Sequence, residues 1–386
     1  MSTKTTQRLG FPNASIRLYE NYDNWLQNNF IEMGATFISM TLRDGLYGTN
    51  EGLISVYDIT SMHTHMSGDE LIEVKIGNSN QNYSRQRVYS IRHFSVSVDD
   101  KNDTILTFQL SPYHVNKNVK FGRTFFSNAS ETIETMLESI YADAPLLIPK
   151  VNSLNVYVPK MPWTSSISDY MNFVRDVGLA VQSDQFPFLW EDFNGINFMD
   201  YETMINQEPV NFIVGSANIV GIYADRLKYP LAFNFEWRTK SNSYTRNPVS
   251  DSTIYSHSML DQNVTRISNG SANNSILVSR SGAYSDMIYR NGYEETLRIL
   301  TMAQYDGYAK ATIYGNFDMT PGMKVQFYDT KNQMLSNFYV DEVIHEISME
   351  TSLTNLYMFT NSKELETISP IKVKNELKTD TSNQES

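Results

Sequence analysis

The sequence contains no cysteine among its 386 residues. Disulfides, iron–sulfur clusters, thiolate zinc sites and cysteine nucleophiles are therefore excluded together. Long apolar runs are also missing, because no segment approaches the roughly 18 residues that span a bilayer and the first nine residues lack the apolar core of a signal peptide. We expect a soluble protein, without a membrane anchor, that is synthesised in a cytoplasm.

Positive charge is scarce, since 31 Lys and Arg face 43 Asp and Glu, a formal net charge of −12. This balance predicts poor nonspecific affinity for nucleic acid, with a local basic patch left open. Large apolar side chains are plentiful, with 24 Tyr, 20 Phe and 4 Trp. They provide enough buried surface to offset the entropy of folding, and the length predicts about two to four domains.

The first 110 residues show the two-residue alternation of strands. Apolar residues alternate with polar ones over residues 74–76, 94–98 and 106–110, which predicts strands with one apolar face. The polar cluster at residues 99–103 predicts a hairpin turn between the last two strands. An antiparallel barrel or sandwich follows.

Residues 113–206 differ in pattern. A capping box precedes a helical face over residues 131–141, and a second helix is expected from about residue 166. The Asn-Gly pair at residues 194–195 is a strong signal for a tight hairpin turn. We interpret this region as a separate α+β unit.

Residues 240–275 are rich in Ser, Asn and Thr and show little periodicity, which predicts an exposed, loop-heavy insertion. A helix is expected at about residues 294–304. Strand patterns occupy much of residues 207–239 and 307–360. The polar end, residues 361–386, is expected to be flexible when unbound.

Two hairpin segments match each other. Residues 88–93 match residues 340–345 at a constant separation of 252, and residues 104–108 match residues 354–358 at a separation of 250. The match predicts a duplicated barrel whose second hairpin turn is two residues shorter, with chance similarity between hairpins as the alternative. A duplicated domain would double the apparent symmetry, so three chains would present six similar barrels.

Four of the six histidines lie in patterns that bear on metal binding or catalysis. His63 and His65 could present two imidazoles from one side of a strand to a metal, but no spacing identifies a third ligand. His93 and His345 occupy matching positions in strands, where satisfied structural histidines are expected.

Glu191 and Asp192, beside Trp190, could form the acid pair of a glycosidase. Adjacent residues of a strand point to opposite faces, so we interpret the two carboxylates as a solvated hairpin end. No phosphate-binding glycine loop, nucleophile elbow or EF-hand loop is present. The residues favour a structural or binding protein, with no catalytic residue, cofactor or metal, over an enzyme.

Longer stretches of mixed composition run in order through most of the chain: Gly10-Phe-Pro-Asn13, Leu42-Arg-Asp-Gly-Leu-Tyr-Gly48, His93-Phe-Ser-Val-Ser-Val-Asp99, Asn206-Gln-Glu-Pro209, Leu227-Lys-Tyr-Pro-Leu-Ala232, Ser279-Arg-Ser-Gly-Ala-Tyr-Ser285, Thr301-Met-Ala-Gln-Tyr-Asp-Gly-Tyr-Ala-Lys310 and Phe338-Tyr-Val-Asp-Glu-Val-Ile-His345. Together they closely resemble the central baseplate hub proteins of T-even-type contractile-tailed bacteriophages. The part from Thr320-Pro-Gly322 through the last of these stretches also resembles the broader hub family shared with type VI secretion spikes.

The resemblance implies an α+β, mainly β chain with two similar antiparallel barrel-like tube domains, an α+β domain and an inserted segment. Three chains would form a homotrimeric ring that adapts the sixfold tail tube to the threefold cell-puncturing lysozyme spike protein. The ring would contact the tail tube and other baseplate proteins in the virion and form part of the DNA channel, without binding DNA specifically. No catalytic residue is implied, because the enzyme is the partner.

Sequence pattern and resemblance together divide the chain into five parts: tube barrel domain one at 1–112, the α+β domain at 113–206, tube barrel domain two at 207–239 and 307–368, the insertion at 240–306, and a flexible tail at 369–386.

Ile368, Pro370, Ile371 and Val373 form the only apolar patch of the polar C-terminal segment. We predict that this patch becomes ordered against a baseplate neighbour, with the spike protein as the candidate and a disordered end as the alternative.

Two other functions stay open. A tail-associated envelope hydrolase would carry an acid pair in a helical, lysozyme-like domain, and none is found. A receptor-binding tail fibre would show elongated repeats, whereas this chain has a single duplicated domain.

Overall fold

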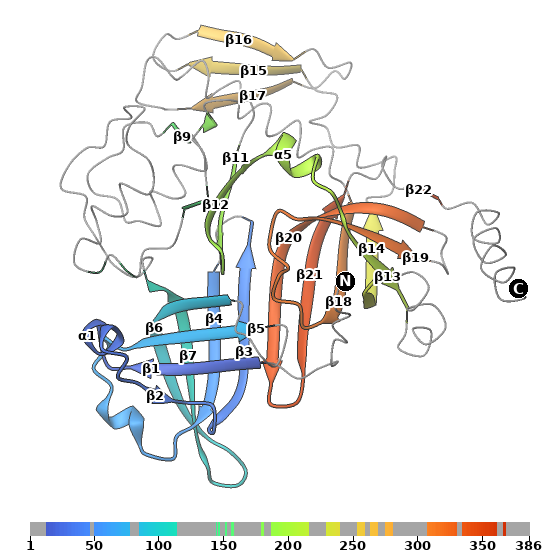
Figure 1. Cartoon of the computed structure of the whole chain (residues 1–386). Helices are drawn as coiled ribbons and strands as arrows, with labels where there is room; N and C mark the ends of the chain where they lie inside the picture. Colours follow the sequence, from blue (N-terminus) through green and yellow to red (C-terminus); the bar gives the residue numbers. More distant parts are fainter. Residues whose placement is uncertain are drawn as a thin grey trace, which may run out of the picture.

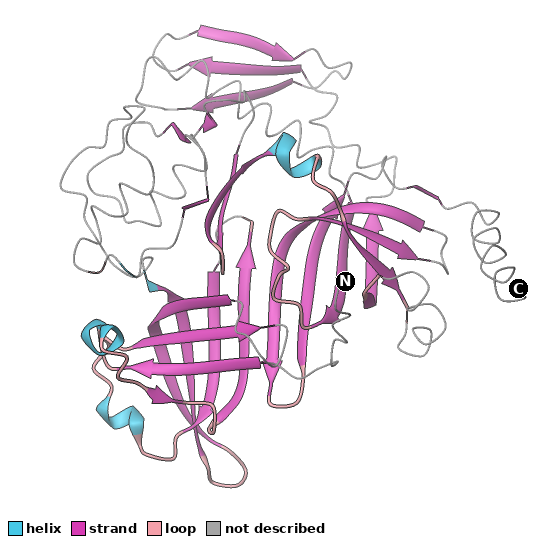
Figure 2. Ribbon diagram, in the orientation of Figure 1, coloured by secondary structure: helices cyan, strands magenta, loops and turns pink. Residues whose placement is uncertain are grey.

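The computed structural model describes residues 13–46, 50–77, 85–113, 144, 146, 151–152, 156–157, 179–180, 187–215, 229–239, 253–258, 263–268, 275–280, 307–329, 334–360 and 366–367. Strands dominate these residues (Figure 2). No helix among them is long and apolar enough to span a membrane.

Six strands form what we call the N-terminal sheet: β1 (Asn13–Tyr19), β3 (Phe37–Gly45), β4 (Asn50–Tyr57), β5 (Leu71–Gly77), β6 (Arg85–Val98) and β7 (Thr104–Pro112). Their order across the sheet is β3-β4-β7-β6-β5-β1, and the short β2 (Ile31–Glu32) pairs with β1. The connections carry helix α1 (Tyr22–Leu26) and the 3-10 helix η1 (Met62–His65).

Six later strands form what we call the C-terminal barrel: β13 (Val210–Val214), β14 (Leu231–Thr239), β18 (Gly307–Tyr314), β19 (Lys324–Asp329), β20 (Met334–Ser348) and β21 (Ser352–Thr360). The barrel closes because β19 pairs with β20 on one side and with β13 on the other. The short β22 (Glu366–Thr367) pairs with the start of β20.

The two halves repeat one strand order. The C-terminal order β14-β18-β21-β20-β19-β13 matches the N-terminal order β3-β4-β7-β6-β5-β1, strand for strand in chain order. The two halves differ in the direction of the strand that ends this order: β1 runs antiparallel to β5, whereas β13 runs parallel to β19. The duplication expected from the sequence is therefore present in the topology.

The hairpins β6–β7 and β20–β21 share a β-bulge, which corrects the residue match. The ladder shifts between Ile91 and His93 in the first hairpin and between Val340 and Glu342 in the second. Equivalent residues are thus 249 apart on β6 and β20, and 248 apart on β7 and β21. The predicted separations of 252 and 250 are wrong, and the second turn is one residue shorter, not two. The sequence match paired Val88 with Val340 and His93 with His345, which occupy different positions relative to the two bulges.

Strand β20 joins the two halves. Its part after the bulge lies between β21 and β3, so the N-terminal sheet and the C-terminal barrel form one sheet of 14 strands (Figure 1). Phe317 and Ile347, from the C-terminal half, belong to the hydrophobic cluster of the N-terminal sheet. The two halves therefore share a core as well as a ladder.

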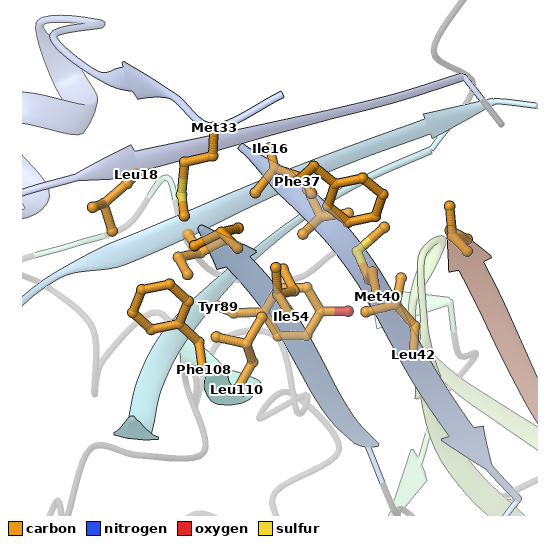
Figure 3. Packing of buried hydrophobic residues seen from close by; sticks show 14 of the residues in the cluster. Ile16, Leu18, Met33, Phe37, Met40, Leu42, Ile54, Tyr89, Phe108 and Leu110 are labelled. Carbon is orange, nitrogen blue, oxygen red and sulfur yellow. The ribbon is translucent and has the colours of Figure 1, made fainter. Parts of the chain in front are cut away.

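The cores follow the alternation predicted from the sequence, with one exception. Leu106, Phe108 and Leu110 are buried together, as Figure 3 shows for Phe108 and Leu110. The apolar residues of the neighbouring segment 94–98 face the same side but are exposed. Strand β5 pairs with β6 only up to Ser90, so nothing in the described part of the chain covers this segment.

Both predicted hairpin turns are confirmed. Asp99 accepts backbone hydrogen bonds of 2.8 and 2.9 Å from Lys101 and Asp103, which closes the β6–β7 turn. Gly195, with φ of 123°, begins β12 (Gly195–Asp200) after β11 (Pro187–Asp192). Helix α5 (Tyr201–Ile205) follows directly. The helices expected at 131–141, from 166 and at 294–304 lie outside the described residues.

The loop-heavy insertion predicted for residues 240–275 is wrong for its described part. A three-stranded sheet of β15 (Thr253–Ser258), β16 (Asn263–Ser268) and β17 (Ser275–Arg280) lies there. Ser, Thr and Asn make up eight of the 18 residues of its strands, and the apolar residues are adjacent or three apart, so no two-residue alternation marks the strands. The remaining short strands are β8 (Val151–Asn152), which pairs with β12, and the pair β9 (Val156–Tyr157) and β10 (Leu179–Ala180).

Candidate assembly surface

The joint between β20 and β3 is held by a ladder and an ion pair. Ladder partners run from Glu342 opposite Gly45 to Ser348 opposite Ser39. Arg43 donates two hydrogen bonds of 2.8 Å to the carboxylate of Glu342. A bidentate pair of this kind fixes the position of one strand against the other.

His345 lies in the core of this joint. Its Nδ1 is 3.0 Å from the hydroxyl oxygen of Thr354, and its ring meets Phe317 edge to face. Burial lowers the pKa of His345 to about 3, so the imidazole is neutral at physiological pH. The expectation of a structural histidine is confirmed here. It is wrong for His93, which is exposed and matches Glu342 in the corrected register.

The face of the joined sheet opposite the two cores is polar. Across β14, β18, β20, β3 and β4, the ladder partners place these charged side chains on it: Arg43, Glu51, Glu236, Arg238, Lys310, Glu342 and Glu346. We call this the polar face. Its three cations and four carboxylates leave it close to neutral and slightly acidic.

A groove of about 640 Å³ opens onto the polar face, and Arg43, Lys310, Glu342 and Tyr357 are among its lining residues. The Nζ of Lys310 lies 5.1 Å from the ring centre of Tyr357. Both signs of charge therefore line the groove, without the excess of cations that would attract phosphate.

A buried ionic cluster attaches the hairpin β11–β12 to the N-terminal sheet. Arg87 donates hydrogen bonds to Asp44 at 2.8 Å and to the Tyr89 hydroxyl at 3.1 Å. Its Nε lies 3.8 Å from a carboxylate oxygen of Glu191, and its guanidinium lies 4.4 Å from the ring centre of Phe193. One buried cation thus contacts residues of both the N-terminal sheet and the hairpin β11–β12.

The expectation that Glu191 and Asp192 form a solvated hairpin end is wrong, because both are buried. Asp192 accepts a hydrogen bond of 3.2 Å from the indole nitrogen of Trp190 and one of 2.6 Å from the backbone of Asn194. The hairpin folds back onto the sheet, which removes its end from water. Both carboxylates have structural partners, Arg87 beside Glu191 and the Trp190 and Asn194 donors at Asp192.

Burial also raises the pKa of Asp44 to about 6, against the lowering effect of Arg87. The nearby charges of Asp192 and Glu191 act in the same direction as burial. The cluster therefore holds more negative than positive charge when all its groups are ionised.

Gly322 lets the same hairpin approach the C-terminal barrel closely. Its φ is 77°, its N–H donates to the carbonyl of Val340 at 2.8 Å, and a Cβ there would lie 2.9 Å from Trp190. Glycine at the third position of Thr320-Pro-Gly322 allows both the positive φ and the close approach of Trp190.

His63 and His65 lie in the 3-10 helix η1, not on a strand, so their expected placement is wrong. The Nδ1 of His63 hydrogen-bonds to Asp58, which also accepts from the backbone of Met62 at 2.7 Å. Among the described residues, no group of three or more His, Cys, Asp or Glu side chains could hold a metal ion.

The predicted docking patch of Ile368, Pro370, Ile371 and Val373 lies outside the described residues, and its role stays a prediction. The cluster around Arg87 was missed at the sequence level. Asp44, Arg87 and Glu191 are far apart in the chain, and no local motif joins them.

Comparison with known families accounts for this architecture. The model of the baseplate structural protein family, domain 1, matches residues 7–201, and the model for domain 2 matches residues 204–376. The chain belongs to the phage baseplate structural protein family. Membership indicates a non-enzymatic structural role for this baseplate protein and a place in the tail baseplate of a virion. The resemblance found in the sequence is confirmed.

Solved structures show the same fold at low sequence identity. The tail protein from Neisseria meningitidis MC58 is 12% identical with a TM-score of 0.59, over 92% of this chain and 98% of that one. The 43 kDa tail protein of prophage MuSo2 from Shewanella oneidensis is 8% identical with a TM-score of 0.54, over 92% and 100%. Comparison with curated proteins found no match to the chain.

Proposed function

We propose that this baseplate protein is the hub of a contractile phage tail. As a trimeric ring, it would adapt the sixfold tail tube to the threefold cell-puncturing lysozyme spike. The observation that carries the proposal is the repeated six-strand order of the two halves. Three chains with two similar units each present six similar units to a sixfold tube and keep threefold symmetry toward a spike.

The proposed domain division follows the predicted boundaries. Tube domain one would span residues 1–112 and tube domain two residues 207–239 and 307–368. Residues 113–206 would form the domain between them, 240–306 the insertion and 369–386 the tail. The repeated strand order supports the two tube domains.

The ring predicts three chains per particle. Sedimentation equilibrium of the purified chain should give the mass of three copies, and the complex with the spike partner should have that mass plus the mass of the spike. Electron microscopy should show a ring with six similar lobes. A chain that stays monomeric in the spike complex would contradict the proposal.

The same experiment with a chain that ends at Asn361 tests the docking patch. Spike binding should weaken while thermal unfolding stays nearly unchanged, because the removed segment is too polar to support a core of its own. Unaltered binding would refute the docking.

We further propose that the polar face lines the DNA channel. Each Lys or Arg that neutralises a phosphate adds affinity through counterion release and would slow a sliding polyanion, whereas three cations among four carboxylates give little net attraction. Mobility-shift assays with duplex DNA at low salt should show no complex at micromolar protein. A shift that weakens steeply as salt rises would reveal a phosphate-binding track and overturn this part of the proposal.

A further inference from the structure

The distal part of β6, residues 93–98, is a sheet edge that lacks a partner strand in the described part of the chain. Its equivalent on β20, residues 342–347, is covered by β3. The side chains on the core side differ accordingly. Phe94, Val96 and Val98 are 42%, 46% and 61% exposed, whereas all three equivalents on β20 are at most 2% exposed: Val343, His345 and Ile347. An apolar edge of this kind is a template for another strand.

A complementary edge lies on β14. Strand β3 has β4 on one side and β20 on the other, but its counterpart β14 has β18 on one side and pairs with β13 only at Leu231 and Ala232. Its later residues, 233–239, have no partner strand on that second side among the described residues. Trp237, which matches the fully buried Leu42 of β3, is 38% exposed.

We propose that residues 93–98 of one chain pair with β14 of a second copy, repeating between chains the joint that β20 and β3 make within one chain. This inference rests on the proposed ring and names the surfaces that would close it. The occupant is a second copy because each free edge matches one member of a joint already present in the same fold.

The β20–β3 ladder sets the register of the proposed joint. Ile344 lies opposite Arg43 and His345 opposite Leu42. Transfer of these pairs puts Ser95 opposite Arg238 and Val96 opposite Trp237. The apolar residues of the two edges then lie on the core side, where Trp237 covers the stripe of Phe94, Val96 and Val98. The other side continues the polar face across the chain boundary.

The proposed contact joins two different edges, so it is heterologous. In the chain, β6 and β14 are separated by six intervening strands of the same sheet, which prevents one molecule from pairing its own edges. Each copy offers one edge and accepts another, and such contacts produce a closed ring when the rotation between copies closes.

Cross-linking of cysteine pairs tests the joint directly, because the natural chain has no cysteine. The doubly substituted chain S95C/R238C, oxidised or bridged by a short bis-maleimide, should give covalent dimers and trimers on denaturing gels. Directly opposite residues have Cβ atoms about 4.5–5.5 Å apart, within reach of either bridge.

Two controls accompany the cross-linking of S95C/R238C. The chain R43C/I344C carries the equivalent pair within one molecule and should cross-link without forming dimers. The single variants S95C and R238C should give no covalent dimers. Dimers from a single variant would show identical edges meeting, which overturns the proposed heterologous joint.

A charged substitution provides a second test. Val96→Lys should weaken self-association at least tenfold in sedimentation, because it places a charge in an apolar strip of the joint, and should leave thermal unfolding nearly unchanged. The matched control is Ile59→Lys, at an exposed position (77%) outside both edges, which should keep the association.

The outcomes separate this inference from the proposed hub. Trimers of the natural chain without cross-links in S95C/R238C would refute the joint and leave the hub standing. A chain that neither associates with itself or the spike nor cross-links would refute both.

Discussion

Replacement of Arg87 by Met is expected to lower the free energy of unfolding by about 3–5 kcal/mol. Arg87 is buried and is hydrogen-bonded to Asp44, with Glu191 within 3.8 Å. Its removal leaves buried carboxylates without their cation, and an unpaired buried charge costs more than the pair contributes. Urea unfolding with linear extrapolation measures the loss.

The matched control is Arg43→Met. Arg43 also forms a bidentate pair, with Glu342, but its side chain is 41% exposed. Water replaces much of that interaction, so we expect a loss of at most about 1 kcal/mol. Similar losses in both variants would contradict the assignment of the Arg87 cluster as the electrostatic centre of the hairpin docking.

The effect of Arg87→Met should also depend on pH. Burial raises the pKa of Asp44 to about 6, above its unfolded value of 3.8, so the folded chain binds this proton more readily than the unfolded chain does. Acidification from about pH 6 to pH 4 therefore stabilises the fold through this group. Without Arg87 the pKa of Asp44 should rise further. The decrease in the free energy of unfolding caused by Arg87→Met should therefore be smaller at pH 5 than at pH 7.

Replacement of His345 by Gln is expected to change the acid sensitivity of the fold. Burial lowers the pKa of His345 from 6.5 to about 3. Below pH 6.5 the unfolded chain takes up a proton at this position that the folded chain refuses, so stability is lost as the pH falls. At about 1.4 kcal/mol per pH unit, the loss through His345 reaches about 3 kcal/mol at pH 4.

Glutamine cannot take up that proton but retains an amide that can hydrogen-bond to Thr354. At pH 7 the variant should be less stable by about 1–2 kcal/mol, because the edge-to-face contact with Phe317 is lost. Between pH 7 and pH 4 the difference should move by about 3 kcal/mol in favour of the variant. The control His93→Gln replaces an exposed histidine and should leave the free energy of unfolding nearly unchanged. A pH-independent difference for His345→Gln would refute the buried neutral imidazole.

Local signals in the sequence were reliable. The Asp99 cluster and the Asn194-Gly195 pair each predict a turn from residues a few positions apart, and both turns form. The alternation of strand β7 was equally clear, because a strand with one packed face must alternate. Strand β5 also alternates in sequence, although both of its faces are buried. The sheet of β15, β16 and β17 was missed because the apolar residues of these strands do not alternate with polar ones.

Burial and register could not be read in the same way. The alternation over residues 94–98 predicts a strand with one apolar face, but it does not show that this face is exposed to solvent. The sequence predicts a solvated turn at Glu191 and Asp192 because Arg87, the cation beside Glu191, lies about a hundred residues earlier. The hairpin repeat was found in the sequence, but its alignment needed the bulges at Arg92 and Asp341.

The sequence by itself determined the mainly β class, the absence of cysteine chemistry, the family resemblance and the positions of several strands and turns. All of these depend on composition or on residues near one another in the chain. Only the tertiary structure decided which strands share an edge, which charges are buried and which edges stay free. Ladder partners lie some 300 residues apart, as Arg43 and Ile344 do, and their pairing is set by the closure of a whole sheet, not by any local preference.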